Sequence, residues 1–360
     1  TTTVVDSFLW IVVTWLLVRW IRCRDDRLLL WSGLVTAVAL QAKYLIVFFW
    51  LAAVAAILVV GPRDLLRRWL FWAGAAVVVL TALPALVWQA RHGWPQLAMG
   101  QVLAAERDPG GPAGFVLLLL VSAGVLGAPL LGYGLWRTLR SPEYRFLGWT
   151  FLGLVVIFLA TLGHGYYTAG MFAALCAAGA VGLDRVRGRW LPWVAWPAGV
   201  LSAVLVVTLL PVRPATSLAG RTAATNPVNA DSVGWPELAD AVASAYRALP
   251  PDQRRRTTIV AHTYWMAGAL ARYGPPRGLP EVYSPNRGYW YFGSPPDSAT
   301  AVVYVGDTSA HLMQYFDQVR QVATVDNRLG VANTVQGAPI WLCDGPRQPW
   351  SMAWPRLRFL

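Results

Sequence analysis

Four basic side chains in the first 170 residues stand beside apolar stretches and are suited to hold an anion. Lys43, the single lysine of the chain, lies between two apolar stretches. Arg91 and His92 directly follow a third stretch, and His164 stands between two glycines. Ammonium, guanidinium and imidazole groups are good partners for phosphate oxygens, and glycines let a backbone approach a ligand closely. These residues predict a site that binds phosphate.

A second group of polar and aromatic side chains is suited to bind the rest of a substrate. They are Tyr44, Tyr166, Tyr167, Asn286, Tyr289 and Trp290. The last three belong to segment 283–293, in which aromatic rings, Asn and Arg suit stacking on a sugar and hydrogen bonds to its hydroxyls. Asp6, an acid just ahead of the first apolar stretch, is a candidate catalytic group.

Each of these residues also has a plainer explanation, and both readings stay open. A lysine at a membrane surface can simply extend to water, and aromatic residues gather at membrane interfaces. Asp6 suits the N-cap of a helix, and segment 283–293 equally suits packing of one part of the chain onto another. The sequence has neither metal-ligand spacing nor a nucleophile elbow, so no cofactor is predicted and a divalent metal stays open.

Composition predicts the elements that must hold these residues. Hydrophobic residues make up 56% of the 360-residue chain and charged residues 13%, whereas a soluble domain carries about 25% charged residues. Residues 1–211 are nearly continuous apolar runs, and the remainder reads as an ordinary soluble sequence. We therefore expect a multi-span α-helical membrane domain at 1–211, a linker at 212–231 and a small soluble α/β domain at 232–360.

Charge placement predicts the orientation of about eight membrane spans. The spans are expected at 7–21, 28–41, 44–60, 69–89, 114–135, 146–162, 167–183 and 190–211. Thirteen of the sixteen basic residues in 1–211 then fall in loops on one side, the pattern of cytoplasmic loops. Lys43, Arg91 and Arg107 fall on the other side. The net charge of +12 thus reflects topology and argues against nucleic-acid binding.

This topology places a tight turn at 41–44, a loop at 90–113 and a loop at 163–166 on the outer face. Glu106 and Asp108, within the loop at 90–113, are weaker site candidates than Arg91 and His92. The C-terminal domain is expected outside the cytoplasm, in a multi-pass protein of the plasma membrane. The three cysteines, Cys23, Cys176 and Cys343, fall in a cytoplasmic loop, a span and an outer strand, which predicts no disulfide.

The polar part alternates helical and strand patterns. Helices are expected at 235–249, 266–273 and 311–319, and strands at 257–262, 299–305, 320–325 and 339–343. Such alternation predicts an α/β layer domain with a mostly parallel sheet.

Several of these segments, in this order, resemble glycosyltransferase family 39, which includes protein O-mannosyltransferases and lipid A aminoarabinose transferases. They are Asp6 with Trp10, Gln41-Ala42-Lys43-Tyr44, Trp88-Gln89-Ala90-Arg91-His92-Gly93-Trp94-Pro95 and Gly163-His164-Gly165-Tyr166-Tyr167. The tail is similar to that of actinobacterial members with an outer C-terminal domain, through Gly234-Trp235-Pro236, Ser284–Gly293 and Val325-Asp326-Asn327.

The resemblance implies a C-type glycosyltransferase fold and the transfer of a sugar from a polyprenyl-phosphate donor to a lipid, glycan or protein acceptor outside the membrane. Lys43, Arg91, His92 and His164 would hold the donor phosphate, although many members carry lysine where His164 stands. The acidic catalytic motif of the family is expected upstream of Thr1, so residues 1–360 are predicted to be inactive alone. Asp6 is then the candidate acid within this sequence.

Two other functions stay open. A transporter or flippase of a lipid-linked precursor predicts inverted repeats and helices broken at mid-membrane, and the sequence indicates neither. A non-catalytic membrane protein whose outer domain binds a glycan would tolerate loss of Lys43 or Arg91, whereas a transferase would not.

Overall fold

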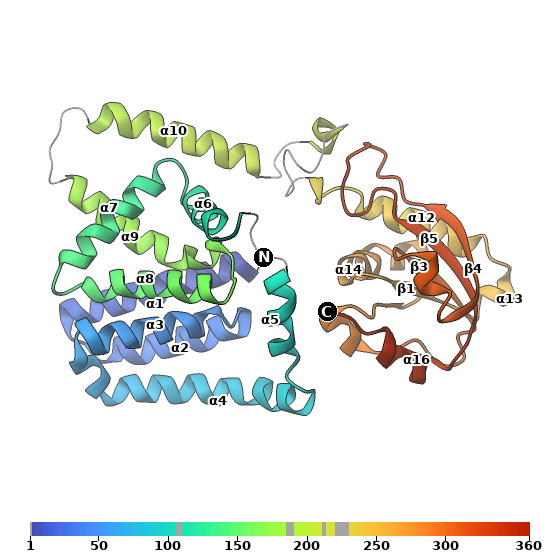
Figure 1. Ribbon diagram of the computed structural model, residues 1–360, viewed down its shortest axis with the longest axis horizontal. Coiled ribbons are helices and arrows are strands. Elements are labelled where there is room, and N and C mark those ends of the chain that lie inside the picture. Colours follow the sequence, from blue (N-terminus) through green and yellow to red (C-terminus); the bar gives the residue numbers. More distant parts are fainter. Residues whose placement is uncertain (1, 106–109, 185–190, 211–213, 220–229) are drawn as a thin grey trace. The chain divides into compact units, whose positions relative to one another are not determined.

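The chain forms two compact units, residues 1–204 and residues 205–360. The computed structural model describes residues 2–105, 110–184, 191–210, 214–219 and 230–360 (Figure 1). Most of the predicted linker, together with Glu106, Arg107, Asp108 and the basic residues at 185, 187 and 189, lies outside the described residues.

The first unit is helical throughout its described part. Its elements are α1 (Thr2–Cys23), α2 (Arg27–Ala42), α3 (Leu45–Val60), η1 (Arg63–Arg67), α4 (Trp69–Arg91), α5 (Pro95–Ala105), α6 (Gly111–Ala123), α7 (Gly127–Arg140), α8 (Arg145–Ala160), η2 (Gly165–Met171), α9 (Phe172–Asp184) and α10 (Leu191–Leu209). In the described residues, three helical segments are long and apolar enough to cross a membrane: α1, α4 and Gly165–Leu183. The apolar, helical character predicted for this part is thereby confirmed.

The predicted division of residues 28–60 into two helices is also correct. The chain turns at Lys43 and Tyr44, between α2 and α3. Trp50 Nε1 of α3 donates a hydrogen bond to Thr36 Oγ1 of α2 at 2.9 Å. These two residues lie at similar distances before and after the turn, as an antiparallel hairpin requires. Both helices have only 16 residues, or about 24 Å of length, which is shorter than a typical hydrocarbon core.

Two expectations for the helical unit were wrong. The span predicted at 114–135 is instead α6 and α7, which meet at an angle of 103°. Gly124 has a left-handed backbone (φ 80°), and Ser202 Oγ accepts a hydrogen bond from Leu126 N at 3.0 Å, so the chain turns there. The predicted loop 90–113 contains helix α5, which begins at a proline, a residue favoured at the first helical position.

The helical unit has two chemically different ends. At one end, Arg24 pairs with Asp64 at 2.5 Å, and Arg145 Nε donates to the Val60 carbonyl at 2.6 Å. The loops after α1, α3 and α7, which contain arginines or are flanked by them, therefore meet at this arginine-rich end. The opposite end holds the start of α1 and the turn after α2, because Lys43 donates a hydrogen bond to Thr3.

The second unit combines helices with a five-stranded sheet. Its described elements are η3 (Ala215–Leu218), α12 (Trp235–Arg247), α13 (Pro251–Arg254), β1 (Thr257–Ala261), α14 (Tyr264–Tyr273), η4 (Pro275–Arg277), β2 (Val282–Tyr283), η5 (Arg287–Phe292), β3 (Ala301–Val305), α15 (Ser309–Leu312), β4 (Phe316–Thr324), β5 (Pro339–Pro346) and α16 (Trp350–Leu357). The predicted small α/β part is thus confirmed in outline.

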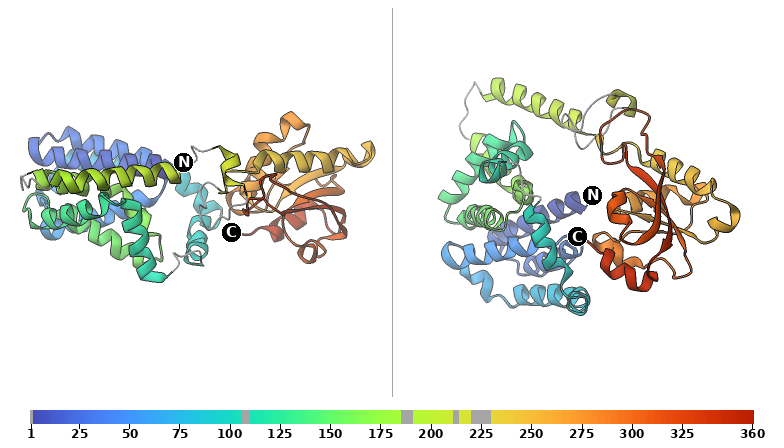
Figure 2. Two further views of the ribbon diagram at one scale, coloured as in Figure 1. Left: turned by 90° about the horizontal axis from the view of Figure 1, so that it is seen from above. Right: turned by 45° about the vertical axis from the view of Figure 1, so that its right-hand side comes forward.

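The strand order is β2-β1-β3-β5-β4, and only β2, β1 and β3 are parallel. Strand β5 pairs antiparallel with both β3 and β4, so the sheet is mixed rather than mostly parallel. Alternate residues of β1 and β3 enter two cores, one shared with α12 and α14 and the other with α16. Helices therefore cover both faces of the sheet (Figures 1 and 2).

The helix predicted at 311–319 was wrong beyond Leu312. Helix α15 ends at Leu312, and the chain enters β4 at Phe316. Phe316 is buried beside Trp350, and β4 pairs with β5 through a bulge between Gln321 and Ala323. Hydrogen bonding to β5 outweighs the local helical pattern. Strand β4 forms one edge of the sheet.

Candidate functional site

Lys43 lies in a polar cluster at the end of the helical unit opposite the arginine-rich end. Its Nζ donates a hydrogen bond to Thr3 Oγ1 at 3.1 Å and lies 5.4 Å from the centre of the Tyr167 ring. Lys43 has left the helical conformation (φ −158°, ψ 140°), since α2 ends there. The start of α1, the turn after α2 and η2 thus supply the hydroxyl, the ammonium and the ring, respectively.

Asp6 belongs to the same cluster and is buried, with 5% of its surface exposed. Trp10 Nε1, one turn further along α1, donates a hydrogen bond to Asp6 Oδ1 at 3.1 Å, and the Lys43 ammonium lies within electrostatic range. The N-cap explanation for Asp6 is wrong, because α1 already begins at Thr2. A buried carboxylate that keeps both an indole partner and a nearby cation is an arrangement that binding or catalysis can use.

His164 joins the cluster through aromatic contacts. Its ring stacks on Tyr166, with centroids 5.3 Å apart and planes 10° apart, and lies edge-on to Tyr167 at 5.3 Å. All three side chains are half-buried. Lys43 and His164 therefore both contact Tyr167, and the sequence prediction that they lie on one side of the unit agrees with these contacts.

The glycines around His164 serve packing. A Cβ at Gly165 would lie 2.3 Å from the Phe115 carbonyl oxygen of α6, and one at Gly163 would lie 3.2 Å from the Phe158 and Tyr167 rings. Gly170 passes the Trp10 side chain so closely that a Cβ there would lie 2.6 Å from three of its atoms. These contacts hold η2 against α1 and α6. The close backbone approach predicted at 163–165 is thus made to the protein itself.

Arg91 and His92 lie at the same end of the unit as Lys43, but farther from the polar cluster. Gln41, two residues before Lys43, donates a hydrogen bond to the Thr81 carbonyl of α4. Helix α4 continues for ten residues from Thr81 to Arg91, which is about 15 Å along its axis. Within the part of the chain that the structure describes, Arg91 makes no hydrogen bond or ion pair with Lys43 or His164. Tyr44 is 37% exposed at the turn.

The segment after α4 is a helix–helix corner. Gly93 and Trp94 have left-handed backbones (φ 73° and 56°), and Trp94 N donates to the Gln89 carbonyl at 2.8 Å. The buried Gln89 side chain accepts a hydrogen bond from Gln96 N at 3.1 Å, at the start of α5. His92 stacks on Trp88, with centroids 4.3 Å apart. The corner therefore accounts for Gln89, Gly93 and Trp94 of this segment.

In the second unit, Asn286 and Trp290 make contacts inside the domain. Asn286 is buried and its Oδ1 accepts a hydrogen bond from Tyr264 N, at the start of α14. Trp290 Nε1 donates to the Trp354 carbonyl at 3.1 Å. Tyr289 lines a pocket together with Phe292. Of the three substrate-binding residues predicted in this unit, Tyr289 therefore lines this pocket, and Asn286 and Trp290 do not.

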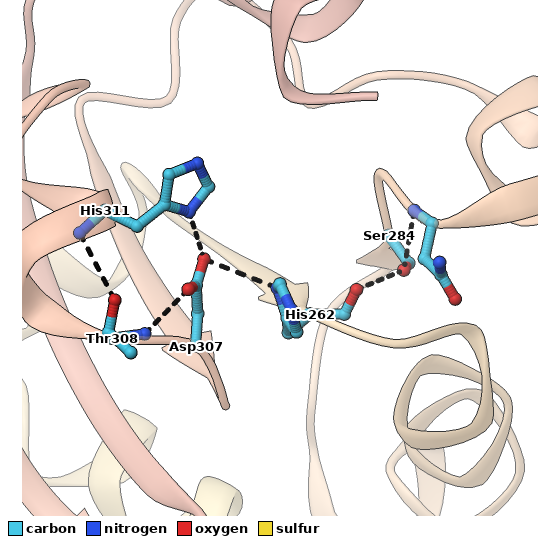
Figure 3. A network of polar contacts seen from close by, with 6 residues as sticks. His262, Ser284, Asp307, Thr308 and His311 are labelled. Atoms are coloured by element: carbon cyan, nitrogen blue, oxygen red, sulfur yellow. Dashed lines mark hydrogen bonds and ion pairs between the residues drawn. The ribbon is translucent and has the colours of Figure 1, made fainter. Parts of the chain in front are cut away.

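Sequence reasoning missed a histidine pair around Asp307. The Asp307 carboxylate lies 2.5 Å from His311 Nδ1 and 3.3 Å from His262 Nδ1, and its other oxygen accepts Thr308 N at 2.7 Å (Figure 3). Burial alone would raise the pKa of Asp307, but the hydrogen bonds from His311 and the Thr308 backbone, together with the electrostatic contact to His262, lower it to about 2. Asp307 also has a left-handed backbone (φ 65°).

This network lies at the carboxyl ends of two neighbouring parallel strands, since His262 follows β1 and Asp307 follows β3. Ligands of open α/β sheets bind at this edge where the connections diverge, as they do here between β1 and β3. Asp307 orients the Nδ1 atom of each ring toward itself, so each Nε2 faces elsewhere. The sequence contained a signal for this network: one strand is followed directly by His262, and another is followed by Gly306-Asp307-Thr308.

Comparisons of the chain with protein families, with curated proteins and with solved structures find no match. Among the described residues, no three His, Cys, Asp or Glu side chains are grouped as metal ligands.

Proposed function

We propose that this chain is a membrane-embedded glycosyltransferase, or the donor-binding part of one, that uses a polyprenyl-phosphate sugar. The observation that carries the proposal is the cluster of Thr3, Lys43 and Tyr167 beside the buried Asp6, at one end of an apolar helical unit. A cation held beside a hydroxyl and a ring at a membrane surface suits a phosphate headgroup whose prenyl chain lies in lipid.

The roles follow from the contacts. Lys43 would bind the donor phosphate, with His164 as a further donor from the same cluster. A phosphate is a good leaving group once its charge is held by fixed cations. Asp6 would position Lys43 or accept a proton from the acceptor hydroxyl. The resemblance to glycosyltransferase family 39 points to the same donor class, and it supplies the expectation that further acidic residues take part.

The orientation is part of the same proposal. The arginine-rich end, where the loops around Arg24, Asp64 and Arg145 meet, would face the cytoplasm of a plasma-membrane protein. The end with Lys43 would then face outward, and the C-terminal unit would be extracytoplasmic. Among the described residues, three segments of sufficient length and four shorter apolar helices support insertion into the bilayer.

Binding of a polyprenyl phosphate by the chain in lipid nanodiscs tests the proposal without requiring turnover. Lys43→Ala should weaken binding about thirtyfold, because losing the charged partner of a phosphate costs about 2 kcal/mol or more. Arg22→Ala, which removes one positive charge at the last turn of α1, is the matched control and should leave binding unchanged. Equal binding by wild type and Lys43→Ala would refute the proposal.

A flippase for a lipid-linked precursor is the second candidate, and one observation favours it. Helices α6 and α7 are broken at an angle of 103°, a feature that transporters use for substrate sites. Reconstitution into liposomes with a fluorescent polyprenyl-phosphate lipid separates the candidates. A flippase would move the lipid between leaflets in the absence of any acceptor, whereas a transferase would bind it and leave its distribution unchanged.

A further inference from the structure

A pocket of about 360 Å³ opens in the C-terminal unit between α14 and the segment around β2 and η5. Its lining includes Leu270, Leu279, Glu281, Tyr283, Tyr289 and Phe292. Pockets that bind small molecules are typically of this size, mostly apolar and supplied with a few polar groups. This pocket is separate from the Asp307 network and uses none of its side chains.

Two aromatic rings form a corner of the pocket. Phe292 is 80% exposed, although it is a large apolar side chain. Its ring meets Tyr289 at 5.3 Å with the planes at 89°, so the two rings stand nearly perpendicular. Tyr289 also packs against the core beneath α12 and α14, which fixes the corner. The exposed ring offers a flat apolar surface with almost no protein contact on it.

Two polar residues of the pocket lining, Glu281 and Tyr283, form a hydrogen-bonded pair. The Tyr283 hydroxyl donates to Glu281 Oε2 at 2.8 Å. Burial and the neighbouring Glu281 carboxylate raise the pKa of Tyr283 to about 12, so its hydroxyl keeps its proton. The donated proton occupies one site on the carboxylate, and the remaining lone pairs of Glu281 and Tyr283 are acceptors. Such acceptors suit the hydroxyl groups of a ligand.

The charge of the lining selects among ligand classes. All the lining residues lie within the described range 230–360, and none of them is Lys, Arg or His. Phosphate and carboxylate ligands would meet an uncompensated Glu281 and are disfavoured. A neutral ring with one apolar face and several hydroxyls matches a flat aromatic surface beside hydrogen-bond acceptors.

We propose that this pocket is a saccharide-binding site, in which Phe292 stacks on a sugar ring and Glu281, with Tyr283, accepts hydrogen bonds from its hydroxyls. The site goes beyond the proposed phosphate cluster, because it would bind sugar whether or not the helical unit binds a polyprenyl phosphate. It also differs from the sequence prediction, since Phe292, Glu281 and Tyr283 take the place of Asn286 and Trp290.

The test is saturation-transfer NMR and titration of the full chain in detergent with four methyl glycosides: α-mannopyranoside, β-glucopyranoside, β-galactopyranoside and β-xylopyranoside. At least one should bind to wild type. Phe292→Ala and Glu281→Gln should each reduce its affinity about tenfold or more, the loss expected for one central contact. Both residues are exposed, so these substitutions should leave the fold intact.

Met313→Ala is the matched control, because Met313 is 50% exposed and lies outside the pocket lining. It should bind the glycoside as wild type does. Lys43→Ala should also retain glycoside binding, which separates a failure of this proposal from a failure of the phosphate proposal. Absence of binding by all four glycosides, or tetramethylammonium binding that Glu281→Gln abolishes, would overturn the saccharide assignment.

Discussion

The Lys43 ammonium lies 5.4 Å from the centre of the Tyr167 ring, and this contact joins the turn after α2 to the segment after α8. A cation over an aromatic face contributes about 0.5–2 kcal/mol, depending on how far it is removed from water. Tyr167 therefore fixes the position of the only lysine in a chain whose other cations, histidines apart, are arginines.

Replacement of the Tyr167 ring should weaken polyprenyl-phosphate binding less than loss of Lys43 itself. Tyr167→Leu removes the face on which the ammonium rests, and we expect a loss of about 1 kcal/mol, or roughly fivefold in affinity. Tyr167→Phe keeps the aromatic face and should retain nearly all of the wild-type affinity. Titration of both variants in nanodiscs measures the difference, and equal affinities for the two would show that the ring face is not used.

Gly170→Ala should destabilise the helical unit. The added methyl group would lie 2.6 Å from three atoms of the buried Trp10 side chain, so either that side chain or η2 must move. Overpacking of this kind costs about 1–3 kcal/mol. Thermal unfolding in detergent should show a lower midpoint for Gly170→Ala. Gly132→Ala is the control, because nothing lies within 4 Å of a Cβ at that position, and it should not lower the midpoint.

Acidification should destabilise the C-terminal unit through Asp307. Its folded pKa of about 2 lies below the usual value of 3.8, so its ionised form stabilises the fold above pH 4 and this contribution is lost as pH falls from about 4 to 2. The shift corresponds to about 2 kcal/mol. Hydrogen exchange of β1 and β3 in the full chain, measured across this range, should accelerate in wild type.

Asp307→Asn supplies the comparison for this pH dependence. Hydrogen exchange of β1 and β3 in Asp307→Asn should already be faster at neutral pH, because His262 and His311 lose their carboxylate partner. The exchange rate of this variant should then change little between pH 4 and 2. A variant that kept the full pH dependence of wild type would show that another group is responsible.

The cysteines report membrane orientation. Cys23 is exposed at the arginine-rich end, whereas Cys343 is fully buried in β5 and burial raises the pKa of its thiol to about 12. A membrane-impermeant maleimide should label Cys23 in inverted vesicles and spare it in intact cells. Cys343 should react only after the C-terminal unit is unfolded. Labelling of Cys23 from outside the cell would reverse the proposed topology.

The sequence predicted most helices and strands because their patterns are strong and local. The uniform hydrophobicity of α1 and α4, and the buried runs at β1 and β3, leave few alternatives. The break after α6 escaped prediction, since it depends on Ser202, 76 residues away, accepting a hydrogen bond from Leu126 N. Likewise β4 depends on β5, and no local pattern at 316–319 signals that partner.

The site was predicted in part for a similar reason. Lys43, Asp6 and His164 stood out by residue type; Lys43 and His164 both contact Tyr167, and Asp6 lies within electrostatic range of Lys43. Sequence alone gave no sign that Thr3 would contact Lys43, forty positions later. Asp307 was overlooked because its importance arises from two strand ends that meet only in the folded sheet.

Strand β4, one of the two outer strands of the sheet, has a consequence for handling the protein. An unpaired strand edge invites other chains to extend the sheet, which leads to aggregation. On β4 this edge carries the exposed Arg320, Gln318 and Gln321, and the bulge at Gln321 interrupts its regular spacing. The C-terminal unit should therefore stay dispersed at the high concentrations that crystallisation requires, provided that this strand keeps its polar side chains.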